Sequence, residues 1–255
     1  MNRGAIALTG YTAVVTGAAS GIGRALALHA AEQGMAVAAC DRDEAGLAAL
    51  DNELQAAGVQ AFVQTVDVSN PAAMADFVRA TAHLPPVVLL FANAGILRSG
   101  NVLDMPLVEW RRLIDVNLIG VIATLQAFVP AMRGHGQRAQ VVVTGSTGSM
   151  VISPGLTGYC ATKHALWPIV EALREELVDT PVGASLLMPG AVSTHIFDAV
   201  DPSRSHPTDS ITPEQAASIA FAGALTDQAK ILTHPNYVDR AKARFAKVLD
   251  ELAGE

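Results

Sequence analysis

The fold of this chain is constrained most by a regular alternation of short apolar segments with longer alanine-rich segments. Six apolar segments are predicted as strands, at residues 12–16, 36–40, 61–66, 87–91, 140–144 and 184–187. Helical patterns occupy the intervals between them, near residues 21–33, 44–57, 71–83, 105–132 and 157–178. The strand segments are apolar throughout, which is typical of a parallel sheet that is covered on both faces.

This alternation predicts a doubly wound parallel α/β sheet, Rossmann-like, as a single domain over residues 1–255. The chain is 51% hydrophobic, which is enough for one large core. A barrel of eight strand–helix units is less compatible, because too few units fit beside the long helix at 105–132. Towards the end of the chain, residues 213–226 are predicted as a further helix and residues 229–233 as a last strand.

Charge and cysteine content exclude several classes of function. The 17 basic and 24 acidic residues give a net charge of −7, which disfavours nucleic acid and anionic membranes as partners. Two cysteines, with no CxxC pair, indicate a reduced, cytoplasmic protein. The longest charge-free helical stretch, Val116–Met132, is shorter than the roughly 20 residues of a membrane span. Seven histidines without HxH or HExxH spacing predict no catalytic metal.

A glycine-rich turn, TGAASGIG at 16–23, directly follows the first predicted strand and opens a helix. Gly17 allows a sharp turn, and Gly21 and Gly23 leave no side chain between the backbone and a bound pyrophosphate. Amides at the start of a helix favour negative charge. The position of the turn therefore predicts a dinucleotide site, although glycine spacing by itself also fits a purely structural turn.

The end of the second strand carries the signal for the type of dinucleotide. Asp41 can accept hydrogen bonds from both ribose hydroxyls of the adenosine and would repel a 2′-phosphate, which favours NAD over NADP. The neighbouring Arg42 is evidence in the other direction, because an arginine here can pair with that phosphate.

Tyr159 and Lys163 form a candidate acid/base pair. They are four residues apart on a predicted helix, so their side chains share one face. A nearby ammonium favours the phenolate and is expected to lower the phenol pKa toward neutrality. Such a group can give or take a proton at an alcohol or carbonyl oxygen. The alternative interpretation is a surface tyrosine beside a surface lysine, with no catalytic role.

Hydroxyl groups follow the strand that precedes this helix, in VVVTGSTGSM at 141–150. Ligands of open parallel sheets bind at the carboxyl ends of the strands. Ser146 can donate a hydrogen bond to a developing alkoxide there, and Ser149 and Thr144 are rivals for the role.

These motifs, in this order, resemble those of the short-chain dehydrogenase/reductase family, in its single-domain branch. The similarity extends from about residue 9 to residue 194. It comprises TGAASGIG, an Asp-Val pair at 67–68, NAG at 93–95, Asn117 in the long helix, Ser146, YCATK at 159–163 and PGAVST at 189–194. The family spacing selects Ser146 over Ser149, since Ser146 lies thirteen residues before the tyrosine.

The resemblance implies a role for each matched residue. Tyr159 would be the catalytic acid/base, Lys163 would lower its pKa and hold the nicotinamide ribose, Ser146 would orient the substrate oxygen, and Asn117 would anchor a relay water. Cofactor contacts would come from Gly17, Ser20, Gly21, Ile22, Gly23, Asp41, Arg42, Asp67, Val68, Asn93, Ala94, Gly95, Tyr159, Lys163, Pro189, Gly190, Val192 and Thr194.

The part of the chain after residue 194 has no matching family motif. Residues 195–213 are predicted as a loop or lid on the substrate side, and 236–255 as a C-terminal helix with one apolar stripe. Pro168 is expected to kink the helix that carries the tyrosine. The substrate pocket is predicted to be apolar, lined by Leu97, Met150, Ile152, Leu156, His195, Ile196 and Phe197.

The function predicted from the sequence is NAD-dependent oxidation of a hydrophobic secondary alcohol to a ketone. A carbonyl reductase using NADH or NADPH is the alternative within the same class. A dinucleotide-binding sensor without chemistry is less compatible, because such proteins usually lack the tyrosine or the lysine. The resemblance also implies a homo-oligomer, a tetramer or a dimer, with the helices at 105–132 and 157–178 between subunits.

Overall fold

All strands of the protein belong to one parallel sheet in the computed structural model, which describes residues 4–194, 196 and 208–254. The strand order is β3-β2-β1-β4-β5-β6-β7, and every neighbouring pair is parallel. The strands are β1 (Thr12–Thr16), β2 (Ala36–Asp41), β3 (Ala61–Thr65), β4 (Val87–Ala92), β5 (Ala139–Thr144), β6 (Val182–Met188) and β7 (Lys230–Leu232). The predicted doubly wound, Rossmann-like sheet is confirmed.

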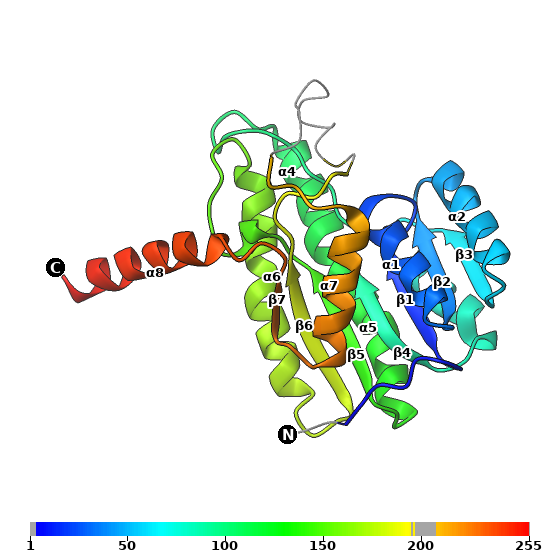
Figure 1. Ribbon diagram of the computed structural model, residues 1–255. Helices are drawn as coiled ribbons and strands as arrows, with labels where there is room; N and C mark the ends of the chain where they lie inside the picture. Colours follow the sequence, from blue (N-terminus) through cyan, green and yellow to red (C-terminus); the bar gives the residue numbers. More distant parts are fainter. Residues whose placement is uncertain (1–3, 195, 197–207, 255) are drawn as a thin grey trace.

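Helices cover both faces of this sheet (Figure 1). One face carries α1 (Gly21–Glu32), α2 (Glu44–Ala56) and α7 (Pro213–Leu225). The other carries α3 (Pro71–Ala80), α4 (Leu107–Ile114), α5 (Gly120–Gly134) and α6 (Thr157–Glu176). The last helix, α8 (Tyr237–Ala253), leaves the body of the molecule at the end of the chain.

Local sequence signals explain where several helices begin. Asp43 accepts a hydrogen bond from the amide of Gly46 at the start of α2, and Asn70 caps α3 in front of a proline. Thr212 and Gln215 form a reciprocal capping box at the start of α7. These caps satisfy amides that would otherwise have no partner in the first turn.

The structure differs from expectation in two helices. The helix predicted at 71–83 ends at Ala80, and a short 3₁₀ turn completes it. The helix predicted at 105–132 is interrupted between α4 and α5 by a π-helical turn at Asp115–Ile119. Helix α6 contains Pro168 within its span from residue 157 to 176, and the kink expected there stays a prediction.

The continuous helical segment Leu107–Gly134 has 28 residues, which is longer than the charge-free stretch suggested. By length and composition alone it could cross a membrane, and it is the one such helix among the described residues. Half of its most apolar window is buried inside the protein. It packs on β4, β5 and α3, as expected for a helix that covers a sheet.

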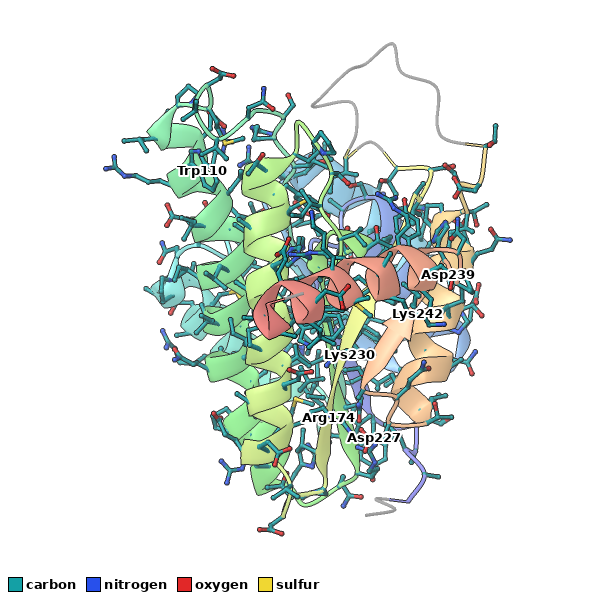
Figure 2. All side chains as sticks on the ribbon, turned by 90° about the vertical axis from the view of Figure 1, so that its left-hand side faces the viewer. Trp110, Arg174, Asp227, Lys230, Asp239 and Lys242 are labelled. Atoms are coloured by element: carbon teal, nitrogen blue, oxygen red, sulfur yellow. The ribbon has the colours of Figure 1, made fainter. Side chains whose placement is uncertain are left out.

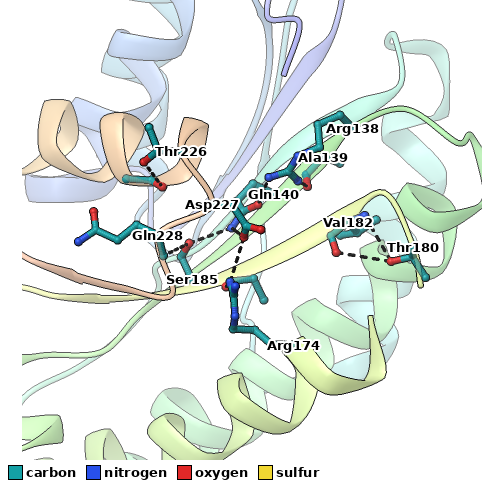
Figure 3. A network of polar contacts seen from close by, with 12 residues as sticks. Arg138, Ala139, Gln140, Arg174, Thr180, Val182, Ser185, Thr226, Asp227 and Gln228 are labelled. Carbon is teal, nitrogen blue, oxygen red and sulfur yellow. Dashed lines mark hydrogen bonds and ion pairs between the residues drawn. The ribbon is translucent and has the colours of Figure 1, made fainter. Parts of the chain in front are cut away.

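The amino-terminal edge of the sheet is fixed by a polar network (Figure 3). Asp227, in the turn after α7, accepts hydrogen bonds from Arg174 of α6 at 2.9 Å and from Gln140 of β5 at 3.1 Å. Gln140 also donates to Ser185 of β6 at 2.9 Å. The network therefore joins α6, β5, β6 and the α7–β7 turn on the side opposite the strand ends that carry the predicted site.

We expect Arg174→Met to lower the free energy of unfolding by about 1–3 kcal/mol, because the half-buried Asp227 carboxylate loses a charged hydrogen-bond donor. Chemical denaturation followed by circular dichroism measures the change. The control is Arg79→Met, which removes an exposed ion pair with Asp76 and should cost less than about 1 kcal/mol. Equal losses in the two variants would show that the network does not stabilise the sheet edge.

Candidate active site

A large pocket of about 720 Å³ lies at the carboxyl ends of the strands. It is lined by every site residue that the sequence predicted except Asn117. Segments that are far apart in the sequence meet here because parallel strands end at the same edge of the sheet.

The glycine turn is closely packed against the backbone that follows β4. Gly17 has a φ of +68°, and a β-carbon on it would lie 2.7 Å from the Cα of Ala94. A β-carbon on Gly23 would lie only 1.9 Å from the carbonyl oxygen of Gly17. Because the cradle has no room for side chains, it leaves the backbone exposed to a ligand, which fits a pyrophosphate group at the start of α1.

Asp41 stands at the end of β2, beside this turn. One carboxylate oxygen accepts a hydrogen bond from the amide of Ala19 at 3.0 Å. The other accepts from the amides of Arg42 and Asp43, at 2.7 and 3.1 Å. The backbone thus holds the carboxylate on the wall of the pocket.

Asp67 lies further along the same wall. Hydrogen bonds from Ser69 hold the pKa of Asp67 below its usual value, and the positive charges of Arg42 and Arg112 act in the same direction. The Arg42 side chain is exposed, and its charge is near enough to act on the Asp67 carboxylate.

Asn93 ties three strand ends together beneath the pocket. Its amide group donates to the carbonyl oxygens of Thr16 at 3.2 Å and Gly17 at 3.4 Å. Its side-chain oxygen accepts from the hydroxyl of Thr144 at 3.1 Å. The residue is therefore a structural brace for β1, β4 and β5 as well as part of the pocket wall.

Lys163 lies beneath Tyr159, as the spacing on the helix predicted. Its ammonium is 5.7 Å from the centroid of the tyrosine ring and donates to the carbonyl oxygen of Thr144 at 2.8 Å. The side chain is only 2% exposed, and burial lowers the pKa of Lys163 to about 8. Both side chains line the same pocket.

The expected lowering of the phenol pKa is not what the structure gives. Burial raises the pKa of Tyr159 to about 12, and a hydrogen bond with Ser146 opposes that rise only in part. The prediction considered the charge of Lys163 and not the loss of solvent around the phenol. Among the protein's own groups, desolvation is therefore the dominant influence on Tyr159.

Ser146 and Ser149 have different positions, although both follow β5. The hydroxyl of Ser149 accepts a hydrogen bond from the amide of Ser146 at 3.2 Å and is 3% exposed. Ser146 lines the pocket and interacts with the Tyr159 side chain. Both serines thus belong to one capping box, in which the Ser146 hydroxyl accepts from the amide of Gly148 at 3.0 Å, and Ser146 is the one of the two that lies on the pocket wall.

Asn117 lies in the π-helical turn, fully buried and outside the pocket lining. Its side chain accepts from the amide of Ile96 at 2.8 Å and donates to the carbonyl oxygen of Ile96 at 2.9 Å. It also donates to the hydroxyl of Thr162 at 3.1 Å. These bonds make it a positioning residue that fixes the loop after β4 to α6, whereas the relay water remains a prediction.

The substrate end of the pocket only partly matches the predicted set. Leu97, Leu156 and Ile196 line it. Met150 does not, and the side chain of Ile152 is 56% exposed away from it. His195 and Phe197, and most of the loop predicted at 195–213, lie outside the described residues.

Two residues near the end of the chain were missed by sequence reasoning. Tyr237, the first residue of α8, lines the pocket. His234 is 5% exposed, and its Nδ1 lies 3.2 Å from the amide nitrogen of Gly190 and 2.6 Å from the hydroxyl of Thr233. The sequence pattern ILTHPNY contains both residues, but only the fold brings it next to PGAVST.

Comparison with known proteins points in the same direction. Residues 11–205 match the model of a family described as short chain dehydrogenase. A 1-deoxy-11-beta-hydroxypentalenate dehydrogenase of Streptomyces avermitilis is 33% identical, covering 96% of this chain and 92% of its own. A cyclohexanol dehydrogenase of an Acinetobacter species is 32% identical, covering 89% of this chain and 92% of its own. A short chain dehydrogenase/reductase of Burkholderia phymatum, solved in complex with NAD, superposes with a TM-score of 0.89 at 31% identity, with 96% of each chain covered.

Proposed function

The chain belongs to the short-chain dehydrogenase family and is an oxidoreductase acting on alcohols, and from this premise we propose that it is an NAD-dependent dehydrogenase that oxidises a hydrophobic secondary alcohol to a ketone. The observation that carries the proposal is the meeting of Ser146, Tyr159 and Lys163 in one pocket with the glycine cradle. An acid/base group and a dinucleotide site in the same pocket are what hydride transfer requires.

In this mechanism the side chains of the protein orient the substrate oxygen and accept its proton. Ser146 donates a hydrogen bond to that oxygen and holds it beside Tyr159. The phenolate of Tyr159 takes the hydroxyl proton, and the buried ammonium of Lys163 stabilises the negative charge on the ring oxygen. NAD, when bound, supplies the hydride acceptor. The glycine cradle and Asp41 would hold its pyrophosphate and its adenosine ribose.

The raised pKa of Tyr159 predicts a pH profile. With that pKa at about 12, the phenol is protonated at neutral pH. As the pH is raised toward the pKa, the fraction of phenolate increases tenfold for each pH unit. We expect kcat/KM for alcohol oxidation to rise with pH up to about 8 and less steeply above it, because Lys163, with a pKa of about 8, then loses the charge that stabilises the phenolate; ketone reduction should show no such rise. Initial rates in constant-ionic-strength buffers measure both. A flat oxidation profile would contradict Tyr159 as the base.

The choice of NAD rests on the Asp41 carboxylate. It is fixed by backbone amides on the pocket wall, where it can bind ribose hydroxyls and repel a 2′-phosphate. Arg42 is a weaker competitor, since its charge already acts on Asp67. The known structure of the Burkholderia phymatum relative with NAD supports the same choice.

We expect Asp41→Ser to shift the ratio of kcat/KM values for NAD and NADP toward NADP by about 10- to 100-fold, equivalent to about 1.4–2.8 kcal/mol. The reason is the removal of a negative charge beside the adenosine ribose. Asp51→Ser, on the exposed surface of α2, is the matched control and should leave the ratio unchanged. No shift in the Asp41 variant would reject this explanation of cofactor choice.

The pocket lining supports an apolar substrate. Leu97, Leu156, Ile196 and Tyr237 are among its lining residues. Arg98 lines it too, but its charge is paired with Glu109 at 3.0 Å. The names of two relatives include hydroxypentalenate and cyclohexanol, and both are compatible with a cyclic secondary alcohol. We therefore favour cyclic or otherwise bulky secondary alcohols over phosphorylated sugars and hydroxy acids.

A spectrophotometric screen tests the function. The absorbance of reduced nicotinamide is followed for a panel of secondary alcohols with NAD and NADP, and for the matching ketones with NADH and NADPH. The proposal predicts the highest kcat/KM with NAD and an apolar secondary alcohol. Turnover restricted to small polar alcohols would reject the substrate class, and cofactor binding without any turnover would reject the enzyme.

Carbonyl reduction is the second candidate, and one observation favours it. With a pKa of about 12, Tyr159 carries its proton at neutral pH and is ready to act as an acid toward a ketone. A kcat/KM for ketone and NADPH that exceeds the value for alcohol and NAD at neutral pH would establish this direction. We also propose a cytoplasmic location and a homo-oligomeric state, which the family resemblance supports.

A further inference from the structure

Helix α8 has two halves with different surroundings. Its first half packs on the body, where Ala241 is buried and the ring of Phe245 lies 6.5 Å from that of Trp167 in α6. Arg244 donates to the carbonyl oxygen of Met150 at 2.9 Å and contacts His164. Beyond these contacts the helix projects from the body (Figure 1), and the view from that side shows it crossing in front of α6 (Figure 2).

The projecting half carries an apolar face that nothing in the described chain covers. Val248 is 42% exposed, Leu249 65% and Leu252 79%. A helix whose last turns lack tertiary contacts is only marginally stable in water, because isolated short helices gain too little from their own hydrogen bonds. A contiguous exposed apolar face of this kind is typical of an interaction surface.

The spacing of this face is that of a coiled-coil seam. Apolar residues follow each other at intervals of three, four, three and four, at Val238, Ala241, Phe245, Val248 and Leu252. This repeat of 3.5 residues keeps one stripe directed at a partner helix. The first part of the stripe meets α6, and the same stripe continues past the end of the body.

The charges of α8 indicate what covers the stripe. Its first eleven residues contain four basic and one acidic side chain, whereas the final six contain two acidic and no basic ones. Two copies of the segment 246–253 in antiparallel orientation would place Lys247 of each copy beside Asp250 and Glu251 of the other. This contact would add to the one that Lys247 makes with Glu251 of its own helix at 3.7 Å.

We propose that the projecting half of α8, residues 246–253, forms an antiparallel helix pair with the same segment of a second copy of this chain. A twofold axis near Leu249 makes the contact self-complementary, as in an isologous interface. The pairing covers Val248, Leu249 and Leu252 on both copies. Because α8 begins with Tyr237 on the pocket wall, the second copy also supports the helix that carries this lining residue.

The first experiment is the double variant Leu249→Asp/Leu252→Asp, examined by size-exclusion chromatography with light scattering. We expect the mass of the assembly to fall to half of the wild-type value. Ala243→Asp, exposed on the opposite face of α8, is the control and should keep the wild-type mass. Far-UV circular dichroism and NAD binding establish that each variant is folded. An unchanged mass for the folded double variant would overturn the proposal.

The second experiment tests the geometry. Leu249→Cys should form a disulfide with its own symmetry mate under mild oxidation, visible as a covalent dimer on a non-reducing gel. Ala243→Cys is the control, and the native Cys40 and Cys160 are buried and do not compete. Absence of the covalent dimer would overturn the antiparallel pairing. A wild-type monomer that sediments with anionic vesicles would overturn it in favour of a membrane surface.

Discussion

Tyr159→Phe should lower kcat for alcohol oxidation by about 10²–10⁴-fold, the usual contribution of an acid/base group. The phenylalanine ring keeps the packing over Lys163 and removes only the atom that exchanges the proton. Because the ring stays in place on the pocket wall and only its hydroxyl is lost, the Kd of NAD should change by less than about 3-fold, or less than 1 kcal/mol. Steady-state kinetics and fluorescence titration measure the two quantities.

The matched control is Tyr11→Phe, which removes an exposed hydroxyl that donates to Gln137 at 3.2 Å. It lies away from the pocket and should retain full activity. Near-normal kcat in the Tyr159 variant would remove the acid/base assignment altogether. A parallel loss of NAD affinity would instead assign the tyrosine to cofactor binding.

Gly23→Val should abolish productive binding of the dinucleotide. Its β-carbon would overlap the carbonyl oxygen of Gly17 and approach the Asn93 amide nitrogen to 2.7 Å. Neither neighbour can move freely, since one is backbone and the other braces three strands. We expect the Kd of NAD to rise at least 100-fold, equivalent to about 2.8 kcal/mol, as measured by isothermal titration calorimetry.

Gly134→Ala serves as the control for this variant. Gly134 ends α5, and a β-carbon there meets nothing within 4 Å. It should bind NAD as the wild type does. If the Gly23 variant is folded by circular dichroism and binds NAD normally, the turn at 16–23 is structural and the pyrophosphate is held elsewhere.

The location of the site was predictable because of the way parallel sheets are built. The glycine turn, Asp41, Asn93, Ser146 and the PGAVST segment each follow a strand, so their convergence at one edge depends only on the strands being parallel. The strands themselves were predictable because their residues are apolar on both faces. Element boundaries differed mainly where a helix ends in a 3₁₀ turn or contains a π-helical turn.

The properties that depend on burial were not predictable. The pKa of Tyr159 is set by how much solvent the folded pocket excludes, and the spacing of Tyr159 and Lys163 carries no information on that. The three hydrogen bonds of Asn117 reach a loop twenty-one residues earlier and a helix forty-five residues later. Tyr237 reaches the pocket only because β7 returns the chain to it.

The anchoring of Lys163 has a further consequence. Its ammonium is bonded to the carbonyl of Thr144, whose hydroxyl is bonded to Asn93, and Asn93 is bonded to the glycine turn. A lysine loses considerable rotamer entropy when its side chain is fixed. Here that loss occurs on folding and does not recur when a ligand binds. The geometry of the candidate site is thus preorganised, so ligand binding energy need not be spent on assembling it.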